Sequence, residues 1–264
     1  MEESNIDVIN KTVLSVNNLM LGPFKNFNIE IPLNSFTIIT GSNKSGKSLL
    51  LKVMALVVNT KKVTYNKEII ANDKDIAYFY DISFKFNTVL ETIRYPLECL
   101  GLDEVKITKL VRDVSKDFKI TKLLKSKIED LSNYEKVKVQ LASLVVSSPK
   151  LLLLDDPGLY LSSLEKEDFM GILEQLRTTG ITIVLSSSSL DEVIYTINST
   201  VYVLDNGSIV SSGSMLDVLS NDSLLNKVGL ELPFMVDLSV KLEYYNLVNK
   251  ITLSPLGLVE SLWK

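Results

Sequence analysis

The sequence predicts an α/β fold with a mainly parallel central sheet, and three observations support this. A glycine-containing stretch from Gly41 to Ser48 lies between an apolar run typical of a strand and a leucine-rich run typical of a helix. A continuous apolar run, Lys150 to Asp155, is bounded by prolines and suits a strand buried on both faces. Strands and helices then alternate, which is typical of parallel β-α-β units.

The stretch from Gly41 to Ser48 reads Gly-Ser-Asn-Lys-Ser-Gly-Lys-Ser and fits the phosphate-binding pattern GxxxxGK[ST]. Its two glycines allow backbone N–H groups to approach phosphate oxygens, and the following helix adds the positive end of its dipole. We expect Lys47 to reach the β- and γ-phosphates and Ser48 to ligate Mg²⁺. A chance glycine turn is the alternative, which the strand before and the helix after disfavour. The predicted nucleotide contacts here are Gly41, Ser42, Asn43, Lys44, Ser45, Gly46, Lys47, Ser48 and Leu49.

The elements predicted before the apolar run at Lys150 to Asp155 fall into two groups. Short β-like runs predict an antiparallel cap and two further strands, at Thr12 to Val16, Phe27 to Ile31, Lys67 to Ile70 and Asp75 to Tyr80. A helical insertion follows, with helices predicted over Thr88 to Leu100 and Asp103 to Phe118.

One face of the second predicted helix is basic, because its cations recur every three or four residues: Lys106, Lys109, Arg112, Lys116 and Lys119. A solvated face is the plainer interpretation. A surface for an acidic partner or for anionic lipid headgroups is the alternative.

The remaining elements complete the sheet and add a tail. We predict strands at Ile181 to Leu185 and Thr200 to Leu204, helices from Ser162 to Thr179 and near Leu190, a hairpin turn at Asn206-Gly207, and tail helices starting near Pro233 and Pro255. The predicted organisation is a nucleotide-binding domain over residues 1–215, with a helical subdomain at about 88–147, and a helical extension over 216–264.

Composition excludes several classes of function. The 264 residues are 46% hydrophobic, enough for one sizeable core, and the net charge of −4 gives no general attraction to nucleic acid. The single cysteine, Cys99, excludes an intrachain disulfide and fits a reducing compartment. We expect no signal peptide and no membrane span, so a membrane role would be peripheral. The absence of histidine excludes imidazole metal sites and Ser-His-Asp triads.

A second nucleotide motif is predicted at Asp155, where four leucines end in a carboxylate. Such an aspartate at the end of a buried strand can hold Mg²⁺ through its water shell. An apolar strand ending in Asp is a weak signal by itself, but the upstream phosphate loop strengthens it.

Between these motifs, Leu131-Ser132-Asn133-Tyr134-Glu135 precedes a helical run over residues 136–146. Two more motifs follow along the chain: Asp155-Asp156-Pro157 at the end of the leucine-rich strand, and Leu190-Asp191-Glu192-Val193. The order of these motifs after the phosphate loop resembles that of an ABC-transporter ATPase, a P-loop NTPase. The sequences Gly229-Leu230-Glu231-Leu232-Pro233-Phe234 and Ile128-Glu129-Asp130 make the chain more similar to the ATPases of energy-coupling factor (ECF) transporters. The resemblance runs from about Val13 to the end.

This resemblance implies an ATP- and Mg²⁺-binding subunit of a membrane importer, lying peripherally on the cytoplasmic face of the cell membrane. A second ABC-type ATPase subunit would pair with it head to tail. The stretch from Leu131 to Glu135, which includes Ser132, stands where the family has its signature sequence, and this signature stretch would close the partner's site. An integral membrane subunit would dock on the helical insertion.

Departures from the family pattern indicate weak hydrolysis. Asp156 stands where a glutamate normally orients the attacking water, and Ser188 stands where the switch histidine is expected. A carboxylate one methylene shorter retracts by roughly 1 Å, which can cost on the order of a hundredfold in rate. Asp81 replaces the sensing glutamine; it could ligate Mg²⁺ but adds negative charge beside a polyphosphate.

The signature stretch departs as well, since Asn133 and Tyr134 replace glycines and Glu135 replaces a glutamine. Ser132 with Glu135 forms a predicted capping box, so Ser132 either only caps the helix or also contacts phosphate. Ser162 with Glu165 forms a second box. For Phe24, the nearest candidate to stack on adenine, ordinary packing is favoured.

The sequence therefore predicts the catalytically degenerate half of a heterodimeric importer ATPase. The alternative is an ATP-binding scaffold or regulator that does not drive transport, which shares every binding residue. An unrelated phosphate-loop kinase or GTPase is disfavoured, because it would lack the Leu-Ser signature stretch.

Overall fold

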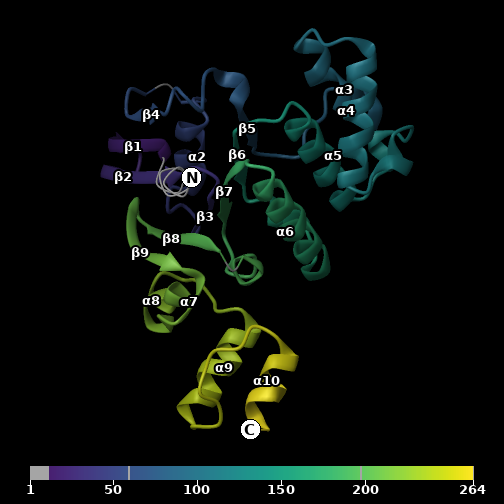
Figure 1. Cartoon of the computed structure of the whole chain (residues 1–264). Coiled ribbons are helices and arrows are strands. Elements are labelled where there is room, and N and C mark those ends of the chain that lie inside the picture. The colour runs from purple at the N-terminus through teal and green to yellow at the C-terminus, as the bar shows by residue number, and fades with distance from the viewer. Residues whose placement is uncertain (1–11, 59, 197, 264) are drawn as a thin grey trace, which may run out of the picture.

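The centre of the protein is a mainly parallel, six-stranded sheet (Figure 1). The computed structural model describes residues 12–58, 60–196 and 198–263, and the strand order in this sheet is β5-β6-β7-β3-β8-β9. The strands are β3 (Phe36–Gly41), β5 (Ile76–Phe79), β6 (Leu151–Asp155), β7 (Thr182–Ser187), β8 (Ser199–Asp205) and β9 (Ser208–Ser214). Every residue of β3 and β7, and the four leucines of β6, are buried, as continuous apolar strands require. The predicted α/β fold class is confirmed.

A second sheet forms the antiparallel cap. Its order is β2-β1-β4, with β1 at Thr12–Leu21, β2 at Phe24–Pro32 and β4 at Val63–Tyr65. The prediction of a strand at Lys67 to Ile70 was wrong, because β4 ends at Tyr65 and a turn follows it. Asn66 accounts for this turn, since its side-chain oxygen accepts a hydrogen bond from the Glu68 amide and its carbonyl accepts one from the Ile70 amide.

The phosphate loop leads into α2 (Lys47–Met54), and the helical insertion consists of α3 (Val89–Cys99), α4 (Glu104–Asp117) and α5 (Asn133–Val145). Figure 1 shows the insertion beside the sheet, with α6 (Ser163–Thr178) between it and β8. Short 3-10 turns are η1 (Asp73–Asp75), η2 (Thr121–Leu123), η3 (Ile128–Asp130), η4 (Pro157–Tyr160) and η5 (Val193–Tyr195).

The helix predicted near Leu190 was wrong, since only η5 forms there. Serine hydroxyls explain this result, because the Asp191 amide donates to Ser189 Oγ at 3.0 Å and the Ser189 amide donates to Ser187 Oγ at 3.1 Å. Such local side-chain acceptors compete with helical backbone bonds.

The predicted helix starts in the insertion and at α6 are confirmed. Both capping boxes form, between Ser132 and Glu135 and between Ser162 and Glu165. In α4, the apolar residues Ile107, Val111 and Val114 are buried, while the basic residues point outward. Carboxylates of Asp103 and Asp113 lie beside Lys106 and Arg112, and Asp168 lies beside Lys119, which follows α4.

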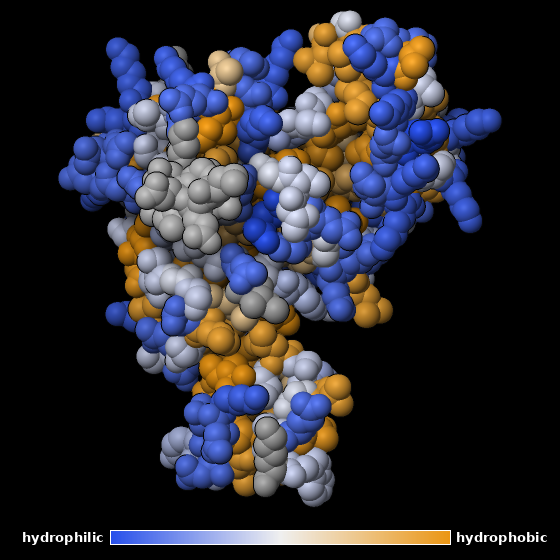
Figure 2. All heavy atoms as spheres, in the orientation of Figure 1, coloured by the Kyte–Doolittle hydropathy of each residue, from blue (hydrophilic) through white to orange (hydrophobic). Residues whose placement is uncertain are grey.

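The C-terminal part is helical, as predicted. It contains α7 (Met215–Leu219), α8 (Asp222–Lys227), α9 (Phe234–Tyr244) and α10 (Pro255–Leu262), and the helix starts at Pro233 and Pro255 are confirmed. In Figure 1, α9 and α10 form a pair that extends beyond α7 and α8, and Figure 2 shows hydrophobic residues on the surface of this pair. Within the described ranges, no helix combines the length and the apolar character needed to span a bilayer.

Candidate nucleotide-binding site

The phosphate loop connects the end of β3 to α2, and its glycines are needed for close packing. Gly41 and Gly46 have φ angles of 151° and 112°, a region that side chains disfavour. An added Cβ would lie 2.2 Å from the Leu204 carbonyl oxygen at Gly41, and 2.7 Å from Phe24 Cζ at Gly46. The loop backbone is thus held tightly against β8 and the cap.

Lys47 lies inside this loop. Its side chain donates to the carbonyl oxygens of Gly41 at 2.6 Å and Ser42 at 3.0 Å, and the residue is 7% exposed. Burial lowers the pKa of Lys47, while the carboxylates of Asp156 and Asp155 act in the opposite direction. The ammonium is therefore placed where it can meet an anion that enters the loop.

A cavity of about 330 Å³ opens over the loop and is lined by Pro23, Asn43, Lys44, Gly46, Lys47, Ser48, Leu49, Asp156 and Ser188. The structure thus brings most of the predicted nucleotide contacts together with both predicted catalytic residues. Pro23 was missed by sequence reasoning, because it comes from the turn between β1 and β2 and carries no motif.

Three predicted loop contacts do not line this cavity. Gly41 lies beneath the loop, and its carbonyl holds Lys47, as does that of Ser42. Ser45 is 2% exposed, and within the described part of the chain its Oγ has no hydrogen-bond partner. The Ser45 carbonyl accepts from the Gly207 amide at 3.1 Å, which ties the loop to the β8–β9 turn.

The predicted metal ligands Ser48 and Asp155 are in direct contact. Ser48 Oγ donates to Asp155 Oδ1 at 2.9 Å, and Ser186 Oγ donates to the same oxygen at 2.8 Å. The hydroxyl of Tyr78 lies 3.4 Å from Asp155 Oδ2. A hydroxyl beside a carboxylate is the kind of oxygen donor set that Mg²⁺ accepts together with phosphate oxygens.

Ser186 and Tyr78 were also missed by sequence reasoning. Both lie on strands next to β6, and Ser186 is the register partner of Asp155. The signal that could have found them is strand order, because the carboxyl ends of adjacent parallel strands meet at one edge of the sheet.

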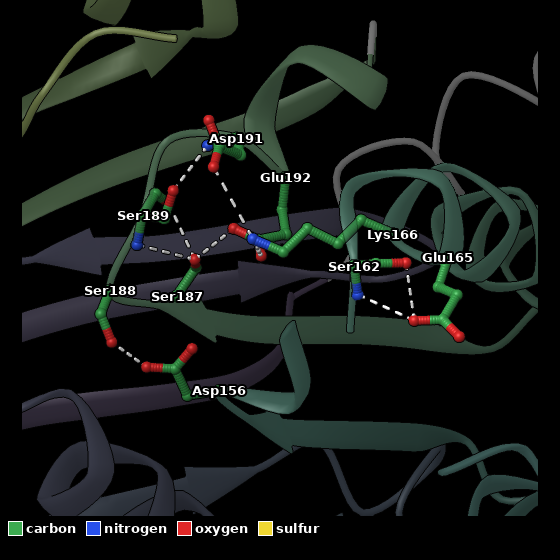
Figure 3. A network of polar contacts seen from close by, with 9 residues as sticks. All are labelled: Asp156, Ser162, Glu165, Lys166, Ser187, Ser188, Ser189, Asp191 and Glu192. Carbon is green, nitrogen blue, oxygen red and sulfur yellow. Dashed lines mark hydrogen bonds and ion pairs between the residues drawn. The ribbon is translucent and has the colours of Figure 1, made fainter. Parts of the chain in front are cut away.

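Asp156 follows β6 in the left-handed conformation, with φ 49°. Its amide donates to the Ser186 carbonyl at 3.1 Å, and its carboxylate accepts a hydrogen bond from Ser188 Oγ (Figure 3). Burial, followed by the negative charge of Glu192, raises the pKa of Asp156 to about 6. The two predicted catalytic residues are therefore bonded to each other.

Asp81 lies after β5 and is held by η4. Its Oδ1 accepts from the Tyr160 hydroxyl at 2.8 Å and from the Ile82 amide at 2.7 Å. In the described part of the chain, the residues that line the cavity do not include Asp81. Its predicted role as a metal ligand stays a prediction.

Ser132 and Phe24 have other surroundings. Ser132 caps α5 in the helical insertion, and its hydroxyl donates to Glu135 Oε2 at 2.9 Å on an exposed surface. Phe24 is 1% exposed, and its ring centroid lies 4.8 Å from that of Phe27. The packing interpretation of Phe24 is confirmed.

Fold and site together define a phosphate-loop nucleotide-binding protein with an acidic strand end beside the loop. A family model described as ABC transporter matches residues 24–158, about half of the chain. The chain belongs to the ATP-binding proteins of the ABC transporter family.

Individual relatives add detail. The energy-coupling factor transporter ATP-binding protein EcfA3 of Oenococcus oeni is 30% identical over 238 residues, covering 83% of this chain and 81% of the relative. A Bacillus thuringiensis subsp. konkukian relative, named for ABC-transporter ATP binding, is 31% identical over 212 residues, yet this chain spans only 38% of its length. Among solved structures, CbiO1 of Clostridium perfringens, part of the ABC transporter complex cbiONQ, is 24% identical with a TM-score of 0.73, covering 83% of this chain and 95% of that one.

Proposed function

We propose that this chain is an ATP-binding subunit of an ECF-type importer and forms the catalytically weaker half of a heterodimeric ATPase pair. Membership in the ABC transporter family and similarity to EcfA3 support the general role. The single observation that carries the proposal of a weak half is the pairing of Asp156 with Ser188 beside a complete phosphate loop.

The site residues fit ATP with Mg²⁺. At Gly41 and Gly46 the loop backbone packs so closely against β8 and the cap that a side chain would not fit, and Ser45 Oγ is a buried polar atom of the loop without a hydrogen-bond partner in the described part of the chain. Loop residues that line the cavity, including Lys47 and Ser48, supply donors that suit phosphate. Lys47 and the loop amides would hold the phosphates, and Ser48 and Asp155 would hold the metal. Bound Mg²⁺ would supply positive charge against the phosphate oxygens.

Hydrolysis at this site should be slow because its two catalytic positions carry short side chains. The Ser188 hydroxyl donates a hydrogen bond to the Asp156 carboxylate. The aspartate side chain is shorter than the glutamate, and the serine side chain is shorter than the histidine, that the family resemblance predicts at these positions. A misplacement of roughly 1 Å in a catalytic group can cost on the order of a hundredfold in rate. The chain would then hold ATP longer than it cleaves it.

Two partners follow from this proposal. A second ABC-type ATPase would contact the exposed N-terminus of α5, where Ser132 lies. An integral membrane subunit would dock on the helical insertion, over a cavity of about 400 Å³ lined by Phe84, Phe86, Asn87, Lys127, Ile128, Glu129 and Lys136. This arrangement would place the chain at the cytoplasmic face of the membrane.

The test is purification of the tagged chain from solubilised membranes with identification of all associated proteins. We expect an integral membrane protein and a second ABC-type ATPase. A complex without a membrane component would favour the regulator. Robust ATP hydrolysis by the isolated chain, abolished by Asp156→Asn, would contradict the proposal of a degenerate half.

A further inference from the structure

A buried ion pair joins α6 to the segment after β7 (Figure 3). Lys166 Nζ lies 2.9 Å from Glu192 Oε1, with the two side chains 15% and 4% exposed. Burial disfavours the charged form of Lys166, but the hydrogen bond to Glu192 and the charge of that carboxylate raise its pKa overall. The pair lies outside the residues that line the nucleotide cavity.

The second oxygen of Glu192 organises the serine turn. Glu192 Oε2 accepts a hydrogen bond of 2.6 Å from Ser187 Oγ, which in turn accepts one of 3.1 Å from the Ser189 amide. Ser188 lies between these two serines, and its hydroxyl donates to Asp156. Glu192 is therefore hydrogen-bonded to the serine turn that carries Ser188.

Glu192 also packs against the segment that follows Asp156. An added Cβ on Gly158 would lie 2.1 Å from Glu192 Oε1, so the η4 backbone rests directly on this carboxylate. The Glu192 side chain thus contacts both segments that lead to the cavity: the segment after Asp156 and the serine turn that carries Ser188. Lys166 places its ammonium beside this buried carboxylate.

We propose that Lys166 and Glu192 are positioning residues that fix Asp156 and Ser188 at the cavity, so that the site discriminates a nucleoside triphosphate from a diphosphate. This inference rests on the proposed function, in which ATP binds over the loop, and on the lining of that cavity by Asp156 and Ser188, which would lie toward the terminal phosphate. Lys47 and the loop amides serve the phosphates that both nucleotides share. Loss of the ion pair should therefore weaken binding of the triphosphate selectively.

The experiment is calorimetric titration of the full chain with the non-hydrolysable triphosphate AMP-PNP and with ADP, each with Mg²⁺. In Lys166→Met, we expect the Kd for AMP-PNP to rise by about tenfold or more, the scale of one lost charged hydrogen bond. The Kd for ADP should change by less than about twofold. Lys166→Arg should keep the wild-type ratio of the two affinities, because it retains the charge and the donors.

Two further variants separate positioning from folding. Lys166→Met combined with Glu192→Leu removes both charges, which is often neutral for stability, yet it also removes the bond to Ser187. This variant should melt near the wild-type temperature and still show the selective loss for AMP-PNP. Lys241→Met is the control. It breaks an exposed ion pair on α9, in which Lys241 Nζ lies 2.6 Å from Asp237 Oδ2, and it should leave the affinities for AMP-PNP and ADP unchanged.

Equal losses for AMP-PNP and ADP in Lys166→Met would overturn the positioning role, as would a wild-type affinity ratio in the double variant. A wild-type chain that binds neither nucleotide would instead refute the proposed function, and this inference with it.

Discussion

The Tyr134 hydroxyl donates a hydrogen bond of 2.6 Å to Asp168 Oδ2 and so joins α5 of the helical insertion to α6. The other oxygen of Asp168 accepts from Lys119 Nζ at 2.9 Å, and Lys138 Nζ lies 4.4 Å from the centre of the Tyr134 ring. The family resemblance predicts a glycine at residue 134. Because residue 134 is a tyrosine in this chain, the first turn of α5 contacts α6.

Tyr134→Phe should therefore destabilise the protein without affecting nucleotide binding. The variant loses one hydrogen bond to a carboxylate, for which about 1.5 kcal/mol in the free energy of unfolding is a reasonable expectation. Urea unfolding measures this loss. Tyr244→Phe is the matched control, because Tyr244 is 81% exposed and its variant should stay within about 0.5 kcal/mol of wild type. Equal losses in the two variants would contradict the role of the Tyr134 bond.

The same contact predicts a dependence of stability on pH. The hydrogen bond from Tyr134, followed by that from Lys119, lowers the pKa of Asp168 from its ordinary value of 3.8. A lowered folded-state pKa adds stability above the ordinary value, and this stability is lost as the pH falls through the folded-state pKa. The difference in free energy of unfolding between wild type and Asp168→Asn should thus shrink from pH 7 to pH 3.

The size of this pH effect is limited by solvent. The Asp168 side chain is 37% exposed, so the part due to charge should not exceed about 1 kcal/mol. Urea unfolding of both proteins at a series of pH values gives the difference directly. A difference that stays constant or grows as the pH falls would argue against an ionised Asp168 in the contact.

The fold could largely be predicted from local signals. The motif located the loop between β3 and α2, and the proline-bounded leucine run located β6. Two local predictions failed where polar side chains supply competing hydrogen bonds: the strand expected at Lys67 to Ile70, and the helix expected near Leu190.

The site was predicted less completely, because part of it depends on strand order. Ser186 and Tyr78 reach Asp155 only because β5, β6 and β7 are neighbours, an order that no local pattern specifies. The contact between Asp156 and Ser188 follows from the register of β6 with β7, in which Asp155 pairs with Ser186.

Lys47→Ala should abolish stabilisation by nucleotide. A ligand present at a hundred times its Kd stabilises the folded state by about 2.7 kcal/mol, which appears as a rise in Tm. We expect this rise with ATP and Mg²⁺ in wild type and none in the variant. Lys52→Ala is the control, because Lys52 lies exposed in the last turn of the same helix. An unchanged Tm rise in Lys47→Ala would refute the role assigned to the loop lysine.

Longer side chains at the two proposed catalytic positions, Asp156 and Ser188, should raise the rate of hydrolysis. Asp156→Glu alone should give little gain, because Ser188 would still be shorter than the histidine that the family resemblance predicts at that position. Asp156→Glu combined with Ser188→His should increase ATP turnover by up to about a hundredfold, the rate that a 1 Å misplacement can cost. The measurement is phosphate release by the chain together with its partner ATPase. Adding Lys47→Ala should cancel the gain, since any new turnover must occur at this loop; a gain that survives Lys47→Ala would place the activity elsewhere.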